Sequence, residues 1–295
     1  EIKQTDRRFV SKPCQMAKQE HLLIVQGEDL ANAKALLDCG ADVFEWQPQV
    51  YRLDALNHAL EHADGVKPTL VLPAVMHSDE LKHLHTWVEQ NADKLSGVVA
   101  NNPGQLALAW PVRVSGGQGL NVMNHACAEF YAALHVDRLT VSCELNQKEL
   151  RDLFAVGGNY VMEAYGRTQL MLLNHCPRRT RNGDEKQDNR CDACAKLGGC
   201  PEIYTDRKGY RFPLRRLQME HGCVLRLYNS VETDMAKYAD KLAGFSVSLR
   251  LAFTDEPLER QKEITASYRS VLDNGRALHT PAAHATAGQL LRGVQ

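Results

Sequence analysis

The sequence predicts an α/β fold, a TIM-like (β/α)8 barrel with an inserted cysteine-rich metal-binding loop and a β-hairpin. Three observations predict it. Short apolar runs alternate with amphipathic segments along most of the chain, no strongly polar linker interrupts them, and five of the nine cysteines fall within residues 176–223. Such alternation implies a parallel sheet, and about eight strands fit a closed barrel better than an open doubly wound sheet, the main alternative.

The expected strands are the apolar runs that follow the polar, aperiodic residues 1–20. They cover residues 22–25, 42–46, 69–75, 97–100, 111–114, 119–123, 138–143, 160–165 and 245–249.

The expected helices lie between and after these runs, where apolar residues recur at spacings of three and four. They cover residues 29–37, 53–62, 79–90, 126–134, 147–154 and 256–274. Two helices have capping signals, since Ser78 precedes an acidic pair and Asn146 precedes Lys148 and Glu149. Residues 204–213 predict a β-hairpin with its turn at 207–209.

The length of 295 residues, with 44% hydrophobic and 24% charged residues, suits one large barrel or two modest domains. We expect residues 1–20 to be a linker or part of a preceding segment. Residues 21–295 then form the barrel domain, with the cysteine-rich insertion at about 174–230. The chain has neither a long apolar run nor a signal-peptide stretch, so we expect a cytoplasmic protein without a membrane partner. The initiator Met is missing, which fits a fragment of a longer protein and leaves open whether the chain is one.

The formal net charge of -1 excludes a global electrostatic field that would attract nucleic acid or an anionic membrane. Any contact with RNA must therefore be local. The visible basic cluster consists of Arg178, Arg179, Arg181, Arg211, Arg215 and Arg216.

The crowded cysteines predict a metal or iron–sulfur site. Cys191 and Cys194 form a Cys-x-x-Cys pair, and more distant cysteines can complete a shell of four thiolates. The candidate ligands are Cys176, Cys191, Cys194 and Cys223, with Cys200 in reserve. Four thiolates suit zinc or a 4Fe-4S cluster equally. The context favours iron, because single distant cysteines complete the shell and Cys176 follows an expected barrel strand, where a cluster could face a substrate.

Barrel enzymes bind substrates at the carboxyl ends of their strands, so polar residues at those positions are the candidate catalytic groups. They include Asn121, Asn124, Glu144, Glu163, Tyr165 and Arg167. Arg167 suits a carboxylate or a phosphate, and Glu144 suits proton transfer. Alternatively, Glu144 caps the following helix and Arg167 pairs with it. Metalloprotease, serine-hydrolase and phosphate-loop motifs do not occur in the sequence.

Ten short motifs, in order along the chain, resemble peptidase family U-32, the collagenase-like peptidases. They are LNVMN at 120–124, RLTVSCELN at 138–146, YGRTQLM at 165–171, HCP at 175–177, CDAC at 191–194, TDRKG at 205–209, FP at 212–213, GC at 222–223, YNS at 228–230 and RGV at 292–294. The resemblance covers residues from about 22 to the end. In long family members, the module with this pattern follows another barrel.

The resemblance implies a TIM-like barrel with a 4Fe-4S centre on Cys176, Cys191, Cys194 and Cys223. Characterised members perform oxygen-independent hydroxylation of RNA bases or of an aromatic quinone precursor. The resemblance therefore implies an iron–sulfur hydroxylase acting on RNA or a small aromatic substrate, with Asn121, Asn124, Glu144, Tyr165 and Arg167 as site residues. Two alternatives remain: a collagenase-like peptidase with a structural zinc, and a non-catalytic module that positions RNA for a preceding barrel module of the same protein.

Overall fold

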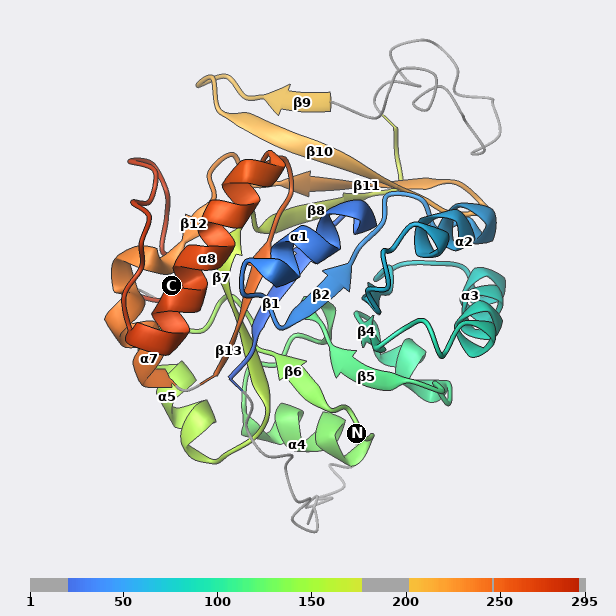
Figure 1. Ribbon diagram of the computed structural model, residues 1–295, viewed down its shortest axis with the longest axis horizontal. Coiled ribbons are helices and arrows are strands. Elements are labelled where there is room, and N and C mark those ends of the chain that lie inside the picture. Colours follow the sequence, from blue (N-terminus) through green and yellow to red (C-terminus); the bar gives the residue numbers. More distant parts are fainter. Residues whose placement is uncertain (1–20, 177–201, 246, 292–295) are drawn as a thin grey trace, which may run out of the picture.

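Eight parallel strands form a closed barrel in the computed structural model (Figure 1), which describes residues 21–176, 202–245 and 247–291. The barrel strands are β1 (Leu23–Gly27), β2 (Val43–Trp46), β3 (Thr69–Val71), β4 (Gly97–Ala100), β5 (Arg113–Gly116), β6 (Arg138–Thr140), β7 (Tyr160–Gly166) and β13 (Ser248–Ala252). Each strand pairs in parallel with the next, β7 pairs with β13, and β13 returns to β1. The predicted barrel is therefore confirmed, and the open sheet is excluded.

The expected strand at 119–123 is wrong, and the expected strand at 245–249 is shifted along the chain. Residues 119–123 contain the end of the 3-10 helix η3 (Gln118–Leu120) and a left-handed Asn121 with φ 49°, and only Val122 bridges to a neighbouring strand. A Cβ on Gly119 would lie 2.0 Å from the backbone oxygen of Asn101, so this glycine allows a close backbone approach in place of a strand. The last barrel strand begins at Ser248, because Phe245 ends the helix α7.

Helices surround the barrel in its outer layer (Figure 1). They are η1 (Leu30–Asn32), α1 (Ala33–Asp38), α2 (Leu53–Glu61), α3 (Ser78–Gln90), η2 (Pro103–Ala107), α4 (His125–Ala133), α5 (Gln147–Ala155), η5 (Met235–Tyr238), α7 (Ala239–Phe245) and α8 (Leu258–Asn274). Asn146 caps α5 as predicted, its Oδ1 accepting from the N–H of Lys148 at 2.9 Å and of Glu149 at 3.1 Å. The expected cap at Ser78 is wrong. His77 precedes α3, and its N–H donates to Glu80.

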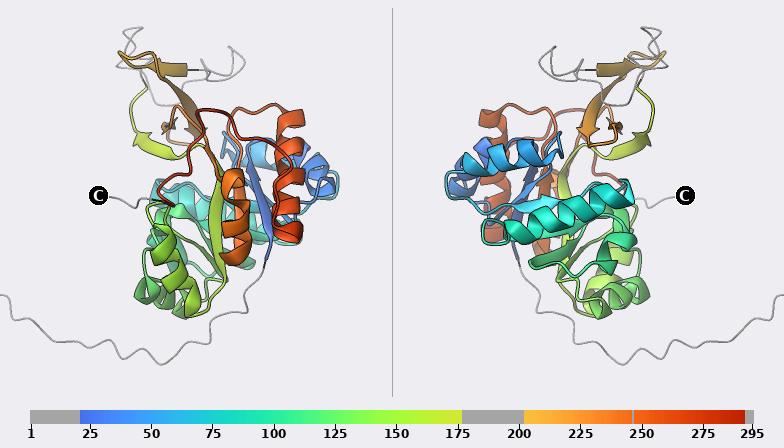
Figure 2. Two further views of the ribbon diagram at one scale, coloured as in Figure 1. Left: turned by 90° about the vertical axis from the view of Figure 1, so that its left-hand side faces the viewer. Right: turned by 90° about the vertical axis from the view of Figure 1, so that its right-hand side faces the viewer.

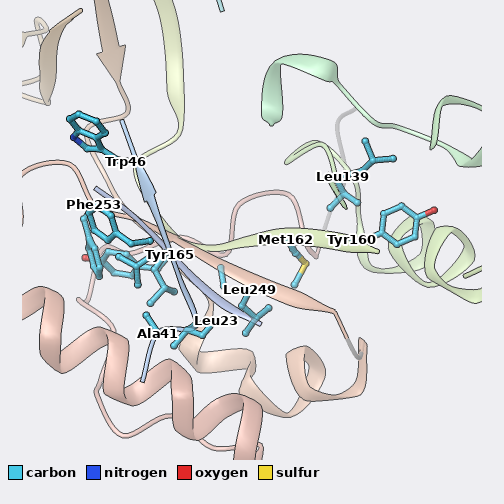
Figure 3. Close-up of a cluster of buried hydrophobic side chains, with 14 of the residues drawn as sticks. Leu23, Ala41, Trp46, Leu139, Tyr160, Met162, Tyr165, Leu249 and Phe253 are labelled. Carbon is cyan, nitrogen blue, oxygen red and sulfur yellow. The ribbon is translucent and has the colours of Figure 1, made fainter. Parts of the chain in front are cut away.

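The main hydrophobic core lies between the barrel strands and this helical layer (Figure 3). Leu23, Tyr160 and Leu249 come from three different strands and are fully buried. None of the helices in the described part of the chain has the length and hydropathy that a membrane span requires.

A second sheet follows β7 in the sequence. Its four antiparallel strands have the order β8 (Gln169–Leu173), β11 (Cys223–Tyr228), β10 (Arg211–Gln218) and β9 (Glu202–Thr205). The predicted hairpin is confirmed, because β9 and β10 pair through Thr205 and Arg211 around a turn in which Asp206 accepts from two N–H groups. Strands β8 and β11 were not expected.

This second sheet covers the carboxyl end of the barrel, above it in Figures 1 and 2. Its contacts fall on residues that directly follow barrel strands. Gln218 pairs with Val50 beyond β2, Arg226 binds Glu28 beyond β1, and Arg215 donates to the carbonyl of Thr254 beyond β13. The active-site end of the barrel fold is thus partly closed by residues of the second sheet.

Candidate functional site

A pocket of about 560 Å³ opens at the carboxyl ends of β6 and β7. Its walls are residues 141–145 after β6, residues of 165–170 from the end of β7 to the start of β8, Asn229, and residues of 286–290 near the end of the chain. Pockets of this size at this end of a barrel commonly hold small ligands. Amide side chains of Gln169 and Asn229 stand beside apolar groups such as Met162 and Leu150.

Glu163 from β7 lines this pocket and is linked to a buried ion pair inside the barrel. Its carboxylate lies 3.8 Å from Arg250, which also contacts Glu45 at 2.8 Å and donates to Thr140 at 2.8 Å. Burial raises the pKa of Glu163, although the positive charge of Arg250 opposes that shift. A carboxyl group with a raised pKa in a pocket is suited to proton transfer.

Two predicted catalytic residues also line the pocket. Glu144 is exposed at its wall, and Tyr165 is buried with its hydroxyl donating to Glu256 at 3.1 Å. Burial and the neighbouring Glu256 carboxylate raise the pKa of Tyr165, so its phenol stays protonated. Because Asn146 provides the cap of α5, the alternative of Glu144 as that cap is not realised.

Arg167 immediately follows β7 and contacts protein groups on several sides. Its guanidinium donates to the carbonyls of Asn229 and Ser230, at 3.3 and 2.7 Å, and forms ion pairs with Glu232 and Asp255 at 3.4 and 3.2 Å. These contacts join the barrel to the turn after β11. Arg167 therefore positions Asn229, and a direct role in binding substrate stays a prediction.

Asn121 and Asn124 lie outside the set of residues that line the pocket. Asn124 caps α4, with its Oδ1 accepting from the N–H of Cys127 at 3.0 Å, and Asn121 occupies the left-handed position described above. The fold thus brings Glu144 and Tyr165 together and leaves these two asparagines apart. Their catalytic role stays a prediction.

The second sheet brings two predicted cysteine ligands to one of its ends. In the β8–β11 ladder Leu173 pairs with Leu225. Cys176 follows Leu173 by three residues, and Cys223 precedes Leu225 by two, so both cysteines lie beyond the same end of this strand pair. Both are half-buried, and Cys176 packs against Leu214 and Leu225 in a small second core.

Cys176 does not lie at the exit of a barrel strand, as was expected from the sequence. It follows β8, a strand of the second sheet, because the barrel strand β7 already ends at Gly166. The other predicted ligands, Cys191 and Cys194, and the reserve ligand Cys200 lie outside the described residues, as do Arg178, Arg179 and Arg181 of the basic cluster.

A buried guanidinium lies on the same face of the second sheet as Cys223. Arg216 pairs with Leu225 and Gln218 pairs with Cys223, so Arg216 and Cys223 are diagonal neighbours, about 7 Å apart across the ladder. Arg216 is 7% exposed. Among residues 21–176, 202–245 and 247–291, none accepts a hydrogen bond from its Nε or Nη1.

A buried guanidinium with two nitrogens that donate to no described group favours an anion nearby. A thiolate-ligated iron–sulfur cluster has a net negative charge and accepts hydrogen bonds at its sulfurs. The two described cysteines, with Arg216 beside them, therefore fit such a cluster.

Glu163 is a strand-end candidate of the sequence analysis that the family resemblance does not include among its site residues. Its signal in the sequence is a single glutamate in the apolar run 160–165. Its importance depends on Arg250 and on the pocket, and both are determined by contacts between distant strands.

No family model matches the sequence, and no curated protein matches it. Among solved structures, the chain is similar to one described as "The Structure of the U32 Peptidase Mk0906". The two chains share 11% sequence identity, and the superposition covers 84% of this chain and 99% of that chain with a TM-score of 0.46. That structure has the name of the family that the sequence motifs resemble.

Proposed function

We propose that this chain is an iron–sulfur enzyme of the U-32 type that hydroxylates an aromatic ring, a base of RNA or a related small substrate, without molecular oxygen. The observation that best supports it is the placement of Cys176, Cys223 and the buried Arg216 on one face of the second sheet. With Cys191 and Cys194, or Cys200 in place of one of them, the two described cysteines would hold a 4Fe-4S cluster. One-electron transfer is the chemistry that such a bound cluster supplies.

The pocket is the proposed substrate site, because its size and lining suit a planar heteroaromatic ring. Gln169 and Asn229 would hydrogen-bond the edge of a base, since amides both donate and accept. The apolar groups of Met162 and Leu150 would contact its faces.

Hydroxylation replaces a ring C–H bond by C–OH and removes two electrons from the ring. The co-reactant is then an organic oxygen-atom donor, which gives up its oxygen and takes up the electron pair as its own bond to oxygen breaks. Glu163 would accept the proton that leaves the ring carbon and return it to the new hydroxyl oxygen, because a raised pKa makes its ionised carboxylate a stronger base than an ordinary one.

The cluster is tested by purifying the chain without oxygen and measuring iron, sulfide and zinc together with the absorption spectrum. We expect about four irons per chain, lost in Cys176→Ser and Cys223→Ser but retained in Cys127→Ser. Cys127 is a matched half-buried cysteine on α4. A colourless protein that contains zinc without iron would contradict the proposal.

The substrate class is tested by mass spectrometry of nucleosides from RNA of cells with and without the gene. We expect a nucleoside heavier by one oxygen to disappear on deletion and to return with the wild-type gene but not with Glu163→Gln. Unchanged nucleosides, together with a normal quinone pool, would exclude hydroxylation of either substrate.

The peptidase alternative finds less support in the described residues. Cys143 is the thiol in the pocket wall, and burial, with the nearby Glu163 and Glu144 carboxylates, raises its pKa to about 11. Such a thiol is protonated at neutral pH and is a poor nucleophile.

Ser267, His279 and Asp234 form a hydrogen-bonded Ser-His-Asp arrangement of the kind that serine peptidases use. Ser267 contacts His279 at 2.7 Å, and His279 contacts Asp234 at 2.8 Å. All three residues are buried, and the Ser267 hydroxyl already accepts from two backbone N–H groups. This arrangement therefore holds α8 to the segment that follows it. Gelatin turnover that survives Cys176→Ser would favour the peptidase.

A further inference from the structure

We propose a second metal site, independent of the cysteines, in which His58, Glu61 and His62 of the α2 region bind a divalent late transition ion such as Zn²⁺. One ligand atom from each of the three residues lies within 4.8 Å of the other two. The proposal goes beyond the function proposed above and does not depend on it.

Helical geometry places the three ligands together. His58 and His62 are four residues apart and so lie on one face, and Glu61 is three residues after His58. The imidazole centroids are 4.4 Å apart, and all three side chains are exposed at the C-terminal end of α2 (Leu53–Glu61). The ion can therefore reach the site from solvent without a change in the core.

The tautomer of His62 is already that of a metal ligand. Its Nδ1 lies 2.8 Å from the carbonyl oxygen of His58, and a carbonyl only accepts, so Nδ1 holds the proton and Nε2 has the free lone pair. A ligating histidine commonly donates its second ring nitrogen to a backbone carbonyl in this way, which fixes the ring orientation.

The donor set selects the ion. Two imidazoles and one carboxylate suit Zn²⁺, Ni²⁺ and Cu²⁺, whereas Mg²⁺ and Ca²⁺ prefer oxygen ligands only. Three protein ligands leave one position of a tetrahedral ion for water or a small ligand. His58 and His62 also line a separate hollow of about 510 Å³ that contains Asp29, so such a ligand has space beside the ion.

The test is a calorimetric titration of the full chain with ZnCl₂, comparing wild type with His58→Gln, His62→Gln and Glu61→Gln. We expect either histidine change to weaken one Zn²⁺ equivalent on the order of a hundredfold, because chelation is lost, and Glu61→Gln to weaken it less. His125→Gln is the matched control, because His125 pairs with Glu129 at the same i, i+4 spacing on α4 without a second imidazole.

The same titration on the Cys176→Ser, Cys223→Ser double variant separates this site from the cysteine site. The histidine-dependent equivalent should persist there, whatever the cysteines bind. Glutamine is compatible with a helix, so unchanged circular dichroism is expected for the histidine variants. Equal Zn²⁺ binding by wild type and both histidine variants, or an equal loss in His125→Gln, would overturn the proposal.

Discussion

Two buried arginines, one in the barrel and one in the second sheet, differ in whether they have partners. Arg250 is 1% exposed, and its guanidinium contacts Glu45, Thr140 and Glu163 from three other strands. Arg216 is almost as buried, yet its Nε and Nη1 have no hydrogen-bond partner in the described part of the chain. Because a buried charge is costly when unpaired, the ion pairs of Arg250 stabilise the barrel interior, whereas Arg216 has two buried nitrogens without an acceptor in the described part of the chain.

The largest expected effect is the loss of the paired arginine. Arg250→Met leaves Glu45 buried without a counter-ion and should lower the free energy of unfolding by about 3–5 kcal/mol. Urea denaturation at neutral pH measures this loss. The control is Arg269→Met, which breaks partly exposed ion pairs with Asp42 and Asp273 and should cost less than about 1 kcal/mol. Equal losses in the two variants would show that burial does not distinguish these arginines.

Asp234 is a second buried charged group with hydrogen-bond partners, and its contribution to stability should depend on pH. Burial alone would raise the pKa of Asp234, but hydrogen bonds from His279, the Ala236 N–H and Tyr268 lower it. The ionised carboxylate therefore stabilises the fold fully above the unfolded pKa of about 3.9, and this contribution is lost as pH falls through the lower folded pKa.

Asp234→Asn should lower the free energy of unfolding by about 2 kcal/mol at pH 7 and remove this part of the acid dependence. Urea denaturation at pH values from about 3 to about 7, a range that includes the usual carboxylate pKa values, measures both effects. Asp240→Asn, an exposed aspartate on α7, is the control and should change neither. An unaltered acid dependence in Asp234→Asn would place its origin elsewhere.

Replacing Arg216 should change the free energy of unfolding in the opposite direction to replacing Arg250. In iron-free protein, Arg216→Met removes an uncompensated buried charge and should raise the free energy of unfolding by about 1 kcal/mol, while Arg216→Lys should not. In iron-loaded protein the same change should accelerate iron loss to a chelator. Destabilisation of the iron-free protein by Arg216→Met would mean that Arg216 already has an anionic partner within the chain.

The smallest expected change in stability concerns Glu163, which lies between the Arg250 ion pair of the barrel interior and the pocket. Burial raises its pKa, so the native state binds this proton more tightly than the unfolded chain does. The resulting stability is complete below about pH 4.3 and is lost as pH rises through the folded pKa. Glu163→Gln should match wild type at low pH and exceed it by less than about 1 kcal/mol at pH 7, measured by urea denaturation. A variant less stable at pH 7 would show that the contact with Arg250 outweighs burial.

Much of the barrel was predictable, because parallel strands and their helices have local periodicities. The hairpin was predictable for the same reason, since Asp206 and Gly209 define its turn locally. The expected strand at 119–123 failed because its apolar residues resemble a strand while Gly119 has to approach Asn101 closely. Of the site, Glu144, Glu163 and Tyr165 could be predicted from their positions at or after the ends of strands. The ion pair between Glu163 and Arg250 could not, because it joins distant strands.

The barrel class, the crowding of cysteines and the motifs of the resemblance follow from the sequence alone, since each depends on residues close together in the chain. The pairing of Leu173 with Leu225, the place of Arg216 on the face of Cys223, and the cover of sheet residues over the carboxyl end of the barrel follow from the folded structure. Strand register between distant segments depends on which side chains are buried together, and a shift of one residue would move Cys223 to the opposite face. No local pattern specifies that choice.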